Sequence, residues 1–314
     1  MTIDEAGILT KKKSMNNWNI KNIPSQDGKV ALVTGANSGI GYETALAFAK
    51  KKMTVILACR NFEKGQKAKN AILKSFTDAQ IEVMQLDTSS LNSVKHFSIE
   101  FLKKFDRLDL LVNNAGIMMS PHRVTEDGFE NQFATNYLGH FALTGHLMPL
   151  LLKTDSSRII TLSSLSYKWS EIQFEDMHFK EGYNKKKAYG QSKRACLIFA
   201  YELQRRLFKT ETNTISIAAH PGLSKTNLDR YFSKLIRPLG ALFLQKQSKG
   251  ALPVLYAALE NSLKGGEYIG PDGFQEMRGN PMIVDSDDYS KNTEIAERLW
   301  NVSEEMTNVS YGFY

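Results

Sequence analysis

Short apolar runs alternate with longer amphipathic segments over most of the chain. Residues 29–34 form the first run, which is rich in valine and ends at Gly35, as is typical of a strand buried on both faces. In the segment that follows, Ile40, Ala45 and Phe48 recur at helical spacing. The same alternation predicts strands at residues 29–34, 53–58, 81–86, 108–112, 158–162 and 214–219, separated by helices over 38–52, 63–76, 91–105, 128–152 and 188–208.

This regular alternation predicts one fold class. Six strands separated by helices favour right-handed βαβ crossovers, which give an open, mainly parallel sheet with helices on both faces. A last short strand at residues 267–269 would bring the sheet to about seven strands. We therefore expect a single doubly wound α/β domain of the Rossmann type.

The ends of the chain are less regular. Residues 1–28 are polar and aperiodic, so we expect an N-terminal arm that carries no chemistry, with the domain over residues 29–314. Two irregular insertions, near residues 165–188 and 224–247, are expected to wall a substrate pocket. Further helices are expected over 249–259 and 292–300, although the pattern does not place the C-terminal tail on the sheet.

Composition narrows the class of protein. Hydrophobic residues make up 42% and charged residues 23% of the 314 residues, a balance that supports a large buried core. The net charge of +7 arises largely from short lysine clusters, which favours a solvated surface over a nucleic-acid groove. The two cysteines, Cys59 and Cys196, lack metal-ligand or disulfide spacing, so we expect no metal site and a cytoplasmic protein. No apolar run reaches eighteen residues, so we expect no membrane span.

A glycine-rich turn joins the first strand to the first helix. The sequence TGANSGIG, from Thr34 to Gly41, lets the backbone turn sharply and lets a pyrophosphate approach the helix N-terminus. Its glycine spacing differs from GxGxxG, and a purely structural turn would carry some of the same residues. The position directly after a strand favours a dinucleotide site.

The end of the second strand indicates which dinucleotide. An NAD site usually has an acidic residue there for the ribose 2′-hydroxyl, whereas this strand ends in Arg60 and the first carboxylate is Glu63. Arg60 can form charge-assisted hydrogen bonds with a 2′-phosphate. NADP(H) is therefore expected, and NAD(H) is the less favoured alternative.

The third chemical signal is Tyr189 with Lys193. Residues four apart project from the same face of a helix, so the ammonium can approach the phenol and favour its ionised form. A phenol has an ordinary pKa near 10. We expect that lowering this pKa makes Tyr189 an acid or base usable near neutral pH.

Together these motifs resemble the short-chain dehydrogenase/reductase family. The resemblance covers about residues 28–314 and also rests on Asn113-Asn-Ala-Gly116 and Ser163-Ser164, which follow the fourth and fifth strands. Within the family the chain looks most like the retinol dehydrogenase-like branch. The further motifs behind that comparison are Ala58-Cys-Arg60, the sequence around Tyr189, His220-Pro-Gly222 and the glycine-rich stretch from Gly265 to Gly273.

The resemblance implies hydride transfer between the nicotinamide of NADP(H) and a carbonyl or alcohol carbon. Its implied catalytic residues are Asn136, Ser164, Tyr189 and Lys193. Its implied cofactor-binding residues are Gly35, Asn37, Ser38, Gly39, Ile40, Gly41, Arg60, Asp87, Thr88, Asn114, Ala115, Gly116, Tyr189, Lys193, Pro221, Gly222 and Thr226. In that scheme Tyr189 moves the hydroxyl proton, Ser164 binds the substrate oxygen, and Asn136 holds a water that links Lys193 to solvent.

Several points stay open at the level of sequence. The gap between Ser164 and Tyr189 is longer than is usual in the family, so Ser163 is a rival for the serine role. A small, lipophilic carbonyl or alcohol substrate is expected, and a homo-oligomer is compatible with the pattern. A catalytically weak NADP(H)-binding regulatory or scaffold protein is the alternative, which the four intact catalytic residues disfavour.

Overall fold

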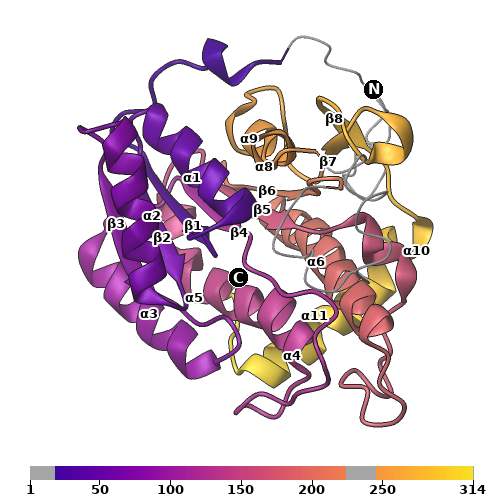
Figure 1. Ribbon diagram of the computed structural model, residues 1–314. Coiled ribbons are helices and arrows are strands. Elements are labelled where there is room, and N and C mark those ends of the chain that lie inside the picture. The colour runs from indigo at the N-terminus through magenta and orange to yellow at the C-terminus, as the bar shows by residue number, and fades with distance from the viewer. Residues whose placement is uncertain (1–17, 224–244, 314) are drawn as a thin grey trace, which may run out of the picture.

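The computed structural model describes residues 18–223 and 245–313, in which eight strands form one sheet (Figure 1). The strand order is β3-β2-β1-β4-β5-β6-β7-β8, so the chain winds outward in both directions from β1 and β4. The strands are β1 Val30–Thr34, β2 Thr54–Cys59, β3 Ile81–Gln85, β4 Leu110–Asn113, β5 Arg158–Leu162, β6 Ile215–Ala219, β7 Tyr268–Pro271 and β8 Pro281–Val284.

The first seven strands run parallel, which confirms the doubly wound α/β fold. The eighth strand, β8, pairs antiparallel with β7 and has no counterpart in the sequence prediction. It is only four residues long and returns without a helical crossover, so the βαβ alternation gives no sign of it. The sheet therefore has one strand more than the seven expected.

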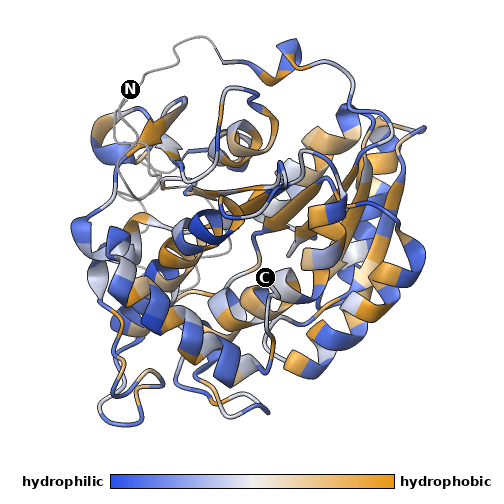
Figure 2. Ribbon diagram, turned by 180° about the vertical axis from the view of Figure 1, so that it is seen from behind, coloured by the Kyte–Doolittle hydropathy of each residue, from blue (hydrophilic) through white to orange (hydrophobic). Residues whose placement is uncertain are grey.

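Helices cover both faces of the sheet, which lies between two hydrophobic clusters (Figure 1). On one face lie α1 Gly39–Lys50, α2 Phe62–Ser75 and α9 Leu252–Leu259, which follows the short α8 Gln247–Gly250. On the other lie α3 Leu91–Lys104, α5 Gly139–Lys153, α6 Lys185–Leu207 and α11 Thr293–Thr307. Figure 2 shows hydrophobic strands at the centre and hydrophilic residues on the outer sides of the helices.

The long helix expected over residues 128–152 is divided in three. Gly128 has a φ of +87° and belongs to a turn, so the helical segment begins only at α4 Asn131–Phe133. A π-helical turn over Ala134–Leu138 follows, and α5 continues from it. Such a turn widens the helix and frees carbonyl groups locally, and it often occurs at functional sites.

The C-terminal segment completes one face of the fold. After the short α10 Asp288–Lys291, α11 extends seven residues beyond the expected end at Trp300. The Trp300 ring packs against Phe141 of α5 and Phe199 of α6, with ring centroids 5.2 and 5.9 Å away. These contacts hold the C-terminal tail against α5 and α6, a position that the sequence pattern did not predict.

The described part of the N-terminal arm is packed on the body. A short 3-10 turn, η1 Ile20–Asn22, follows Trp18, whose ring meets Tyr256 of α9 edge to face at 5.4 Å. Ile20 and Ile23 pack against the same hydrophobic cluster. From Trp18 onward the arm therefore covers the sheet face that carries α9.

Candidate active site

The carboxyl ends of the parallel strands bring the expected site residues to one edge of the sheet. Gly35 follows β1, Arg60 follows β2, Asn114 follows β4, Ser164 lies two residues after β5 and Pro221 lies two residues after β6. Open α/β sheets bind ligands at this edge. Hydrogen bonds join several of these segments to one another or to α6.

The glycine turn leaves the N-terminus of α1 open. Gly35 and Gly39 have φ values of +67° and +63°, which side-chain-bearing residues rarely adopt. Among the described residues, nothing lies within 4 Å of the position that a Cβ on Gly39 would take, and the Ser38 side chain makes no capping hydrogen bond. The first N–H groups of α1 therefore receive no side-chain cap from Ser38, which suits the pyrophosphate of a dinucleotide.

The same turn is bound to the loop after β4. The Thr34 hydroxyl accepts hydrogen bonds from the backbone N–H groups of Asn114 and Ala115, at 2.9 and 2.8 Å. The Asn114 amide donates to the Thr34 carbonyl at 2.7 Å. A Cβ on Gly41 would lie only 2.5 Å from Asn114 Nδ2, so the small residue is required for this approach.

His140 extends the network to Asn136. Its Nε2 lies 2.8 Å from Thr34 Oγ1, and its Nδ1 lies 2.9 Å from the Asn136 carbonyl oxygen. Because a carbonyl only accepts, Nδ1 carries the proton and Nε2 accepts from the Thr34 hydroxyl. Burial lowers the pKa of His140 to about 4, against a smaller opposing effect of the bond to Asn136. The imidazole is therefore neutral near pH 7.

Asn136 lies in the π-helical turn and holds the loop that follows Gly116. Its side-chain oxygen accepts from Ile117 N at 2.8 Å, and its amide donates to Ile117 O and to Ser192 Oγ, both at 2.9 Å. Its backbone carbonyl also accepts from Cys196 Sγ at 3.2 Å. Asn136 thus joins the loop after β4 to α6.

Lys193 reaches the same loop from α6. Its Nζ donates to the Leu162 carbonyl at 3.0 Å and would lie 3.6 Å from a Cβ on Gly116. The side chain is 6% exposed, and burial lowers the pKa of the amine. The expected neighbours Gly116, Asn136 and Lys193 are therefore brought together.

The phenol of Tyr189 differs from the expectation in its protonation. Burial raises the pKa of Tyr189 to about 12, and hydrogen bonding from Ser164 lowers it only in part. The sequence predicted a lowered pKa because of Lys193, but that amine is itself desolvated and donates to Leu162 instead. In the described structure Tyr189 keeps its proton at neutral pH.

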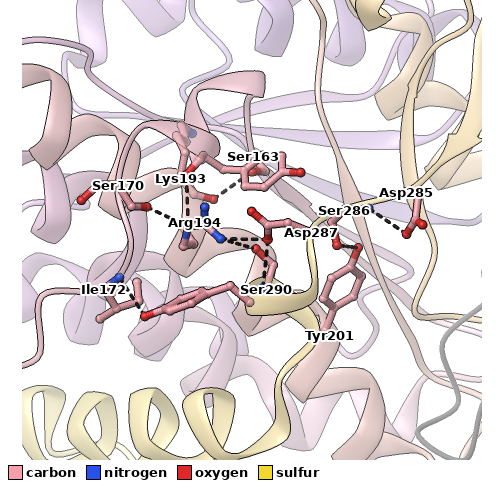
Figure 3. Close-up of polar contacts among 12 residues, drawn as sticks. Ser163, Ser170, Ile172, Lys193, Arg194, Tyr201, Asp285, Ser286, Asp287 and Ser290 are labelled. Carbon is pink, nitrogen blue, oxygen red and sulfur yellow. Dashed lines mark hydrogen bonds and ion pairs between the residues drawn. The ribbon is translucent and has the colours of Figure 1, made fainter.

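The two adjacent serines point in different directions. The Ser163 hydroxyl is buried and donates to the Lys193 carbonyl at 2.8 Å, which attaches β5 to the backbone of α6 (Figure 3). Ser164 is only partly buried, interacts with Tyr189, and caps the 3-10 helix η3 Leu165–Trp169 by accepting from Ser166 N at 3.2 Å. The geometry therefore favours Ser164 over its rival for a substrate contact.

The adenosine side of the site is more open. Arg60 is exposed, and its backbone carbonyl accepts from the Gln85 side chain at 3.2 Å. Asp87 Oδ1 accepts from Ser89 N and Ser89 Oγ at 2.9 and 2.6 Å, so this carboxylate shapes the turn after β3. Thr88 is buried against Gly139, where a Cβ would lie 1.9 Å from Thr88 O.

The loop after β6 is held from two sides. Gly222 has a φ of +62°, and its N–H donates to His220 Nδ1 at 3.3 Å. The Gln245 side chain donates to the Pro221 carbonyl at 2.8 Å. Thr226 lies outside the described residues, as does most of the insertion near 224–247.

Apolar side chains flank the phenol. Met118 and Met119 form a small buried cluster with Tyr189. The Trp169 ring lies 6.1 Å from the Tyr189 ring and is 43% exposed. The sequence predicts that the insertion near residues 165–188 walls a pocket, but nothing in that irregular segment singles out Trp169.

Within residues 18–223 and 245–313, no three His, Cys, Asp or Glu side chains are grouped so that they could ligate a metal ion. Nor do these ranges contain a helix with the length and apolar character needed to cross a membrane.

The chain is similar to proteins of one enzyme family. A family model described as short chain dehydrogenase matches residues 29–235. Retinol dehydrogenase 14 of Mus musculus is 38% identical over 300 residues, which cover 90% of this chain and 86% of that protein. Retinol dehydrogenase 13 of Homo sapiens is 38% identical over 285 residues, which cover 87% and 82%.

Solved structures show the same fold. An uncharacterized protein from Mycobacterium paratuberculosis superposes with a TM-score of 0.79 at 36% identity, covering 94% of this chain and 98% of that one. A short chain dehydrogenase from Shigella flexneri, complexed with NADP, superposes with a TM-score of 0.59 at 23% identity and covers 77% and 96%. From its family model, its relatives and its site geometry, the chain belongs to the short-chain dehydrogenase/reductase family and is an oxidoreductase similar to the retinol dehydrogenases.

Proposed function

We propose that this protein uses NADP(H) to transfer hydride between nicotinamide and a carbonyl or alcohol carbon, with Tyr189 as the general acid or base. The single observation that carries this proposal is the position of the phenol. It lies on α6 beside Ser164, one helical turn from Lys193, at the strand edge where the glycine turn opens. When bound, the cofactor supplies or accepts the hydride.

The protonation of Tyr189 suits carbonyl reduction. With a pKa near 12, the buried phenol holds its proton at neutral pH and can donate it to a carbonyl oxygen as negative charge develops there. The partly exposed Ser164 hydroxyl lies beside the phenol and would donate a second hydrogen bond to the same oxygen.

Lys193 and Asn136 would serve the cofactor side. The Lys193 amine lies beside Gly116 and is buried, so a bound ribose hydroxyl there would find a donor already fixed in position. Asn136 fixes Ile117, the residue that follows Gly116. The glycine turn and the loop after β4 would bind the remainder of the dinucleotide.

The preference for NADP(H) over NAD(H) rests on Arg60. It follows β2 directly, is exposed, and stands where an NAD site usually carries an acidic residue. The first carboxylate after it, Glu63, lies in the first turn of α2. A guanidinium there can bind a 2′-phosphate through charge-assisted hydrogen bonds.

The substrate we propose is lipophilic, since Met118, Met119 and Trp169 surround the phenol. We also propose a cytoplasmic location, supported by two buried cysteines, Cys59 and Cys196, that are free thiols in the structure. A homo-oligomer stays a prediction.

The experiment that tests this function uses the full chain with NADPH and a panel of aldehydes and ketones. NADPH oxidation that depends on the carbonyl compound supports the proposal. The alternative is a regulatory NADP(H)-binding protein, and tight NADPH binding without turnover of any carbonyl or alcohol would favour it. Absence of NADPH binding would contradict both.

A further inference from the structure

The helix that carries Tyr189 and Lys193 carries a second pair of residues at the same spacing. Gly190 and Arg194 each lie one position further along α6, which rotates them about 100° around the helix axis. They form the face of α6 that contacts η3, the helix that begins after Ser164 and ends at Trp169.

At Gly190 the backbone of this segment rests directly on α6. A Cβ on Gly190 would lie 2.8 Å from Trp169 Cβ and 3.0 Å from both Ser166 O and Ser170 N. Any side chain at this position would push η3 away from the helix, because two of these three atoms belong to the backbone.

One turn later, Arg194 binds the end of η3. Its Nε donates to Ser170 O at 2.7 Å and to Tyr167 O at 3.2 Å (Figure 3). Its Nη1 donates to Asp287 Oδ1 at 2.8 Å and to Ser290 Oγ at 2.9 Å, at the start of α10.

The guanidinium is enclosed as well as bonded. The Arg194 side chain is 4% exposed, and its Cζ lies 5.2 and 4.9 Å from the ring centroids of Tyr167 and Tyr289. Removing the donors would leave two backbone carbonyls of the η3 segment without these bonds, so η3 would keep its packing on Gly190 but lose its polar bonds to α6 and, through Arg194, to α10.

We propose that Arg194 is a positioning residue for substrate selection: together with Gly190 it fixes η3 on α6, so that Trp169 forms a rigid wall of the pocket beside Tyr189. The proposal rests on the function proposed above. It explains why a partly exposed ring lies 6.1 Å from the catalytic phenol on a 3-10 helix of only five residues.

The test compares decanal with propanal as substrates in the presence of NADPH. The kcat/KM for decanal divided by the kcat/KM for propanal measures how strongly the apolar wall favours the longer chain. We expect Arg194→Met to lower this ratio about tenfold, the size typical of a lost hydrophobic pocket contact. Trp169→Ala should lower the ratio by a similar factor. Faster amide hydrogen exchange over residues 166–172 in Arg194→Met would show the loosening directly.

A double variant separates positioning from a merely structural role. If Arg194 acts through Trp169, Arg194→Met should change the ratio little once Trp169 is alanine, whereas independent effects would multiply. Arg205→Met is the matched control, since Arg205 also joins α6 to the C-terminal segment, through Lys291 O at 3.2 Å, but lies about three turns beyond Arg194 and further from Tyr189. It should leave the ratio unchanged.

The outcomes distinguish the two proposals. Turnover by the parent protein with an unchanged ratio in folded Arg194→Met would overturn this inference alone. Multiplicative effects in the double variant would also overturn it. A parent protein that binds NADPH but reduces neither aldehyde would refute the proposed function, and the inference with it.

Discussion

The Thr34 hydroxyl and the His140 imidazole, 2.8 Å apart, connect the cofactor side of the site to its catalytic side. Thr34 receives the backbone of Asn114 and Ala115, and His140 binds the carbonyl of Asn136. His140 Nε2 is buried and depends on the Thr34 hydroxyl for its hydrogen bond, whereas that hydroxyl also lies 3.3 Å from the Val112 carbonyl oxygen. The glycine turn and the π-helical turn are thereby held in a fixed relative position.

Replacing Thr34 with valine keeps the shape of the side chain but removes the hydroxyl. The Ala115 N–H and His140 Nε2 would lose their partner, and the Asn114 N–H would keep only its bond to Val112 O at 3.0 Å. We therefore expect a loss of about 2 kcal/mol in the free energy of unfolding and roughly tenfold weaker NADPH binding. Thermal unfolding and fluorescence titration measure the two effects. Thr44→Val is the control, because the buried Thr44 hydroxyl has no hydrogen-bond partner within the described ranges. A similar loss in both variants would contradict the assigned role of Thr34.

The buried imidazole also predicts a pH dependence of stability. The pKa of His140 in the folded protein is about 4, below its ordinary value of 6.5, so protons bind preferentially to the unfolded chain between these values. This contribution destabilises the protein as the pH falls from about 6.5 and amounts to about 3 kcal/mol at pH 4.

The measurement is the free energy of unfolding as a function of pH in the parent and in His140→Gln. We expect the variant to be less stable at pH 7 and to lose about 2 kcal/mol less than the parent between pH 7 and 4.5. His96→Gln, at an exposed histidine of α3, should follow the parent curve. Parallel curves for parent and His140→Gln would show that His140 does not titrate as described.

Gly41 tests the close approach within the glycine turn. A Cβ there would lie 2.5 Å from Asn114 Nδ2 and 2.7 Å from Gly35 O, so Gly41→Ala should cost about 1–3 kcal/mol and weaken NADPH binding. Gly28→Ala provides the comparison, since Gly28 has a strained φ of +78° but no described atom lies within 4 Å of the added carbon. We expect that control to cost about 1 kcal/mol without changing NADPH affinity. Equal NADPH affinity in both variants would argue against a cofactor role for the turn.

The coenzyme preference is tested at Arg60. Arg60→Ala should weaken NADPH binding by roughly ten- to a hundredfold, the effect of a lost charge-assisted hydrogen bond, and leave NADH binding unchanged. Arg298→Ala removes an exposed arginine of α11 and serves as the control. An unchanged ratio of NADPH to NADH affinity in Arg60→Ala would mean that Arg60 does not select the phosphate.

The sequence predicted those parts of the fold that repeat. The strands up to β6 and the helices between them lie close to their predicted residues, because each combines an apolar run or face with a βαβ crossover. The short β8 was not predicted, since four residues in an antiparallel return carry no such pattern. The π-helical interruption of the long helix at residues 134–138 was not predicted either, because such a turn leaves the apolar spacing of the surrounding helix nearly intact.

The candidate site could also be predicted only in part from the sequence. Gly116 follows β4, and Asn136 and Lys193 approach it from the π-helical turn and from α6, so these three residues are brought together. Their roles in the reaction stay predictions. The direction of the Tyr189 pKa was wrong, since spacing along a helix shows which groups are near but not how deeply they are buried. The contacts of His140 and Arg194 join segments more than 20 residues apart and could not be found from local pattern.

The most direct test of the proposed chemistry is carbonyl-dependent NADPH oxidation by Tyr189→Phe compared with Tyr201→Phe. Tyr201 lies on the same helix and is also buried, but its hydroxyl donates to Ser286 at 3.0 Å, away from the strand edge. We predict that Tyr189→Phe binds NADPH normally and loses about a hundredfold or more in kcat, whereas Tyr201→Phe keeps its activity. Turnover by Tyr189→Phe at the parent rate would contradict the assignment of this phenol as the proton donor.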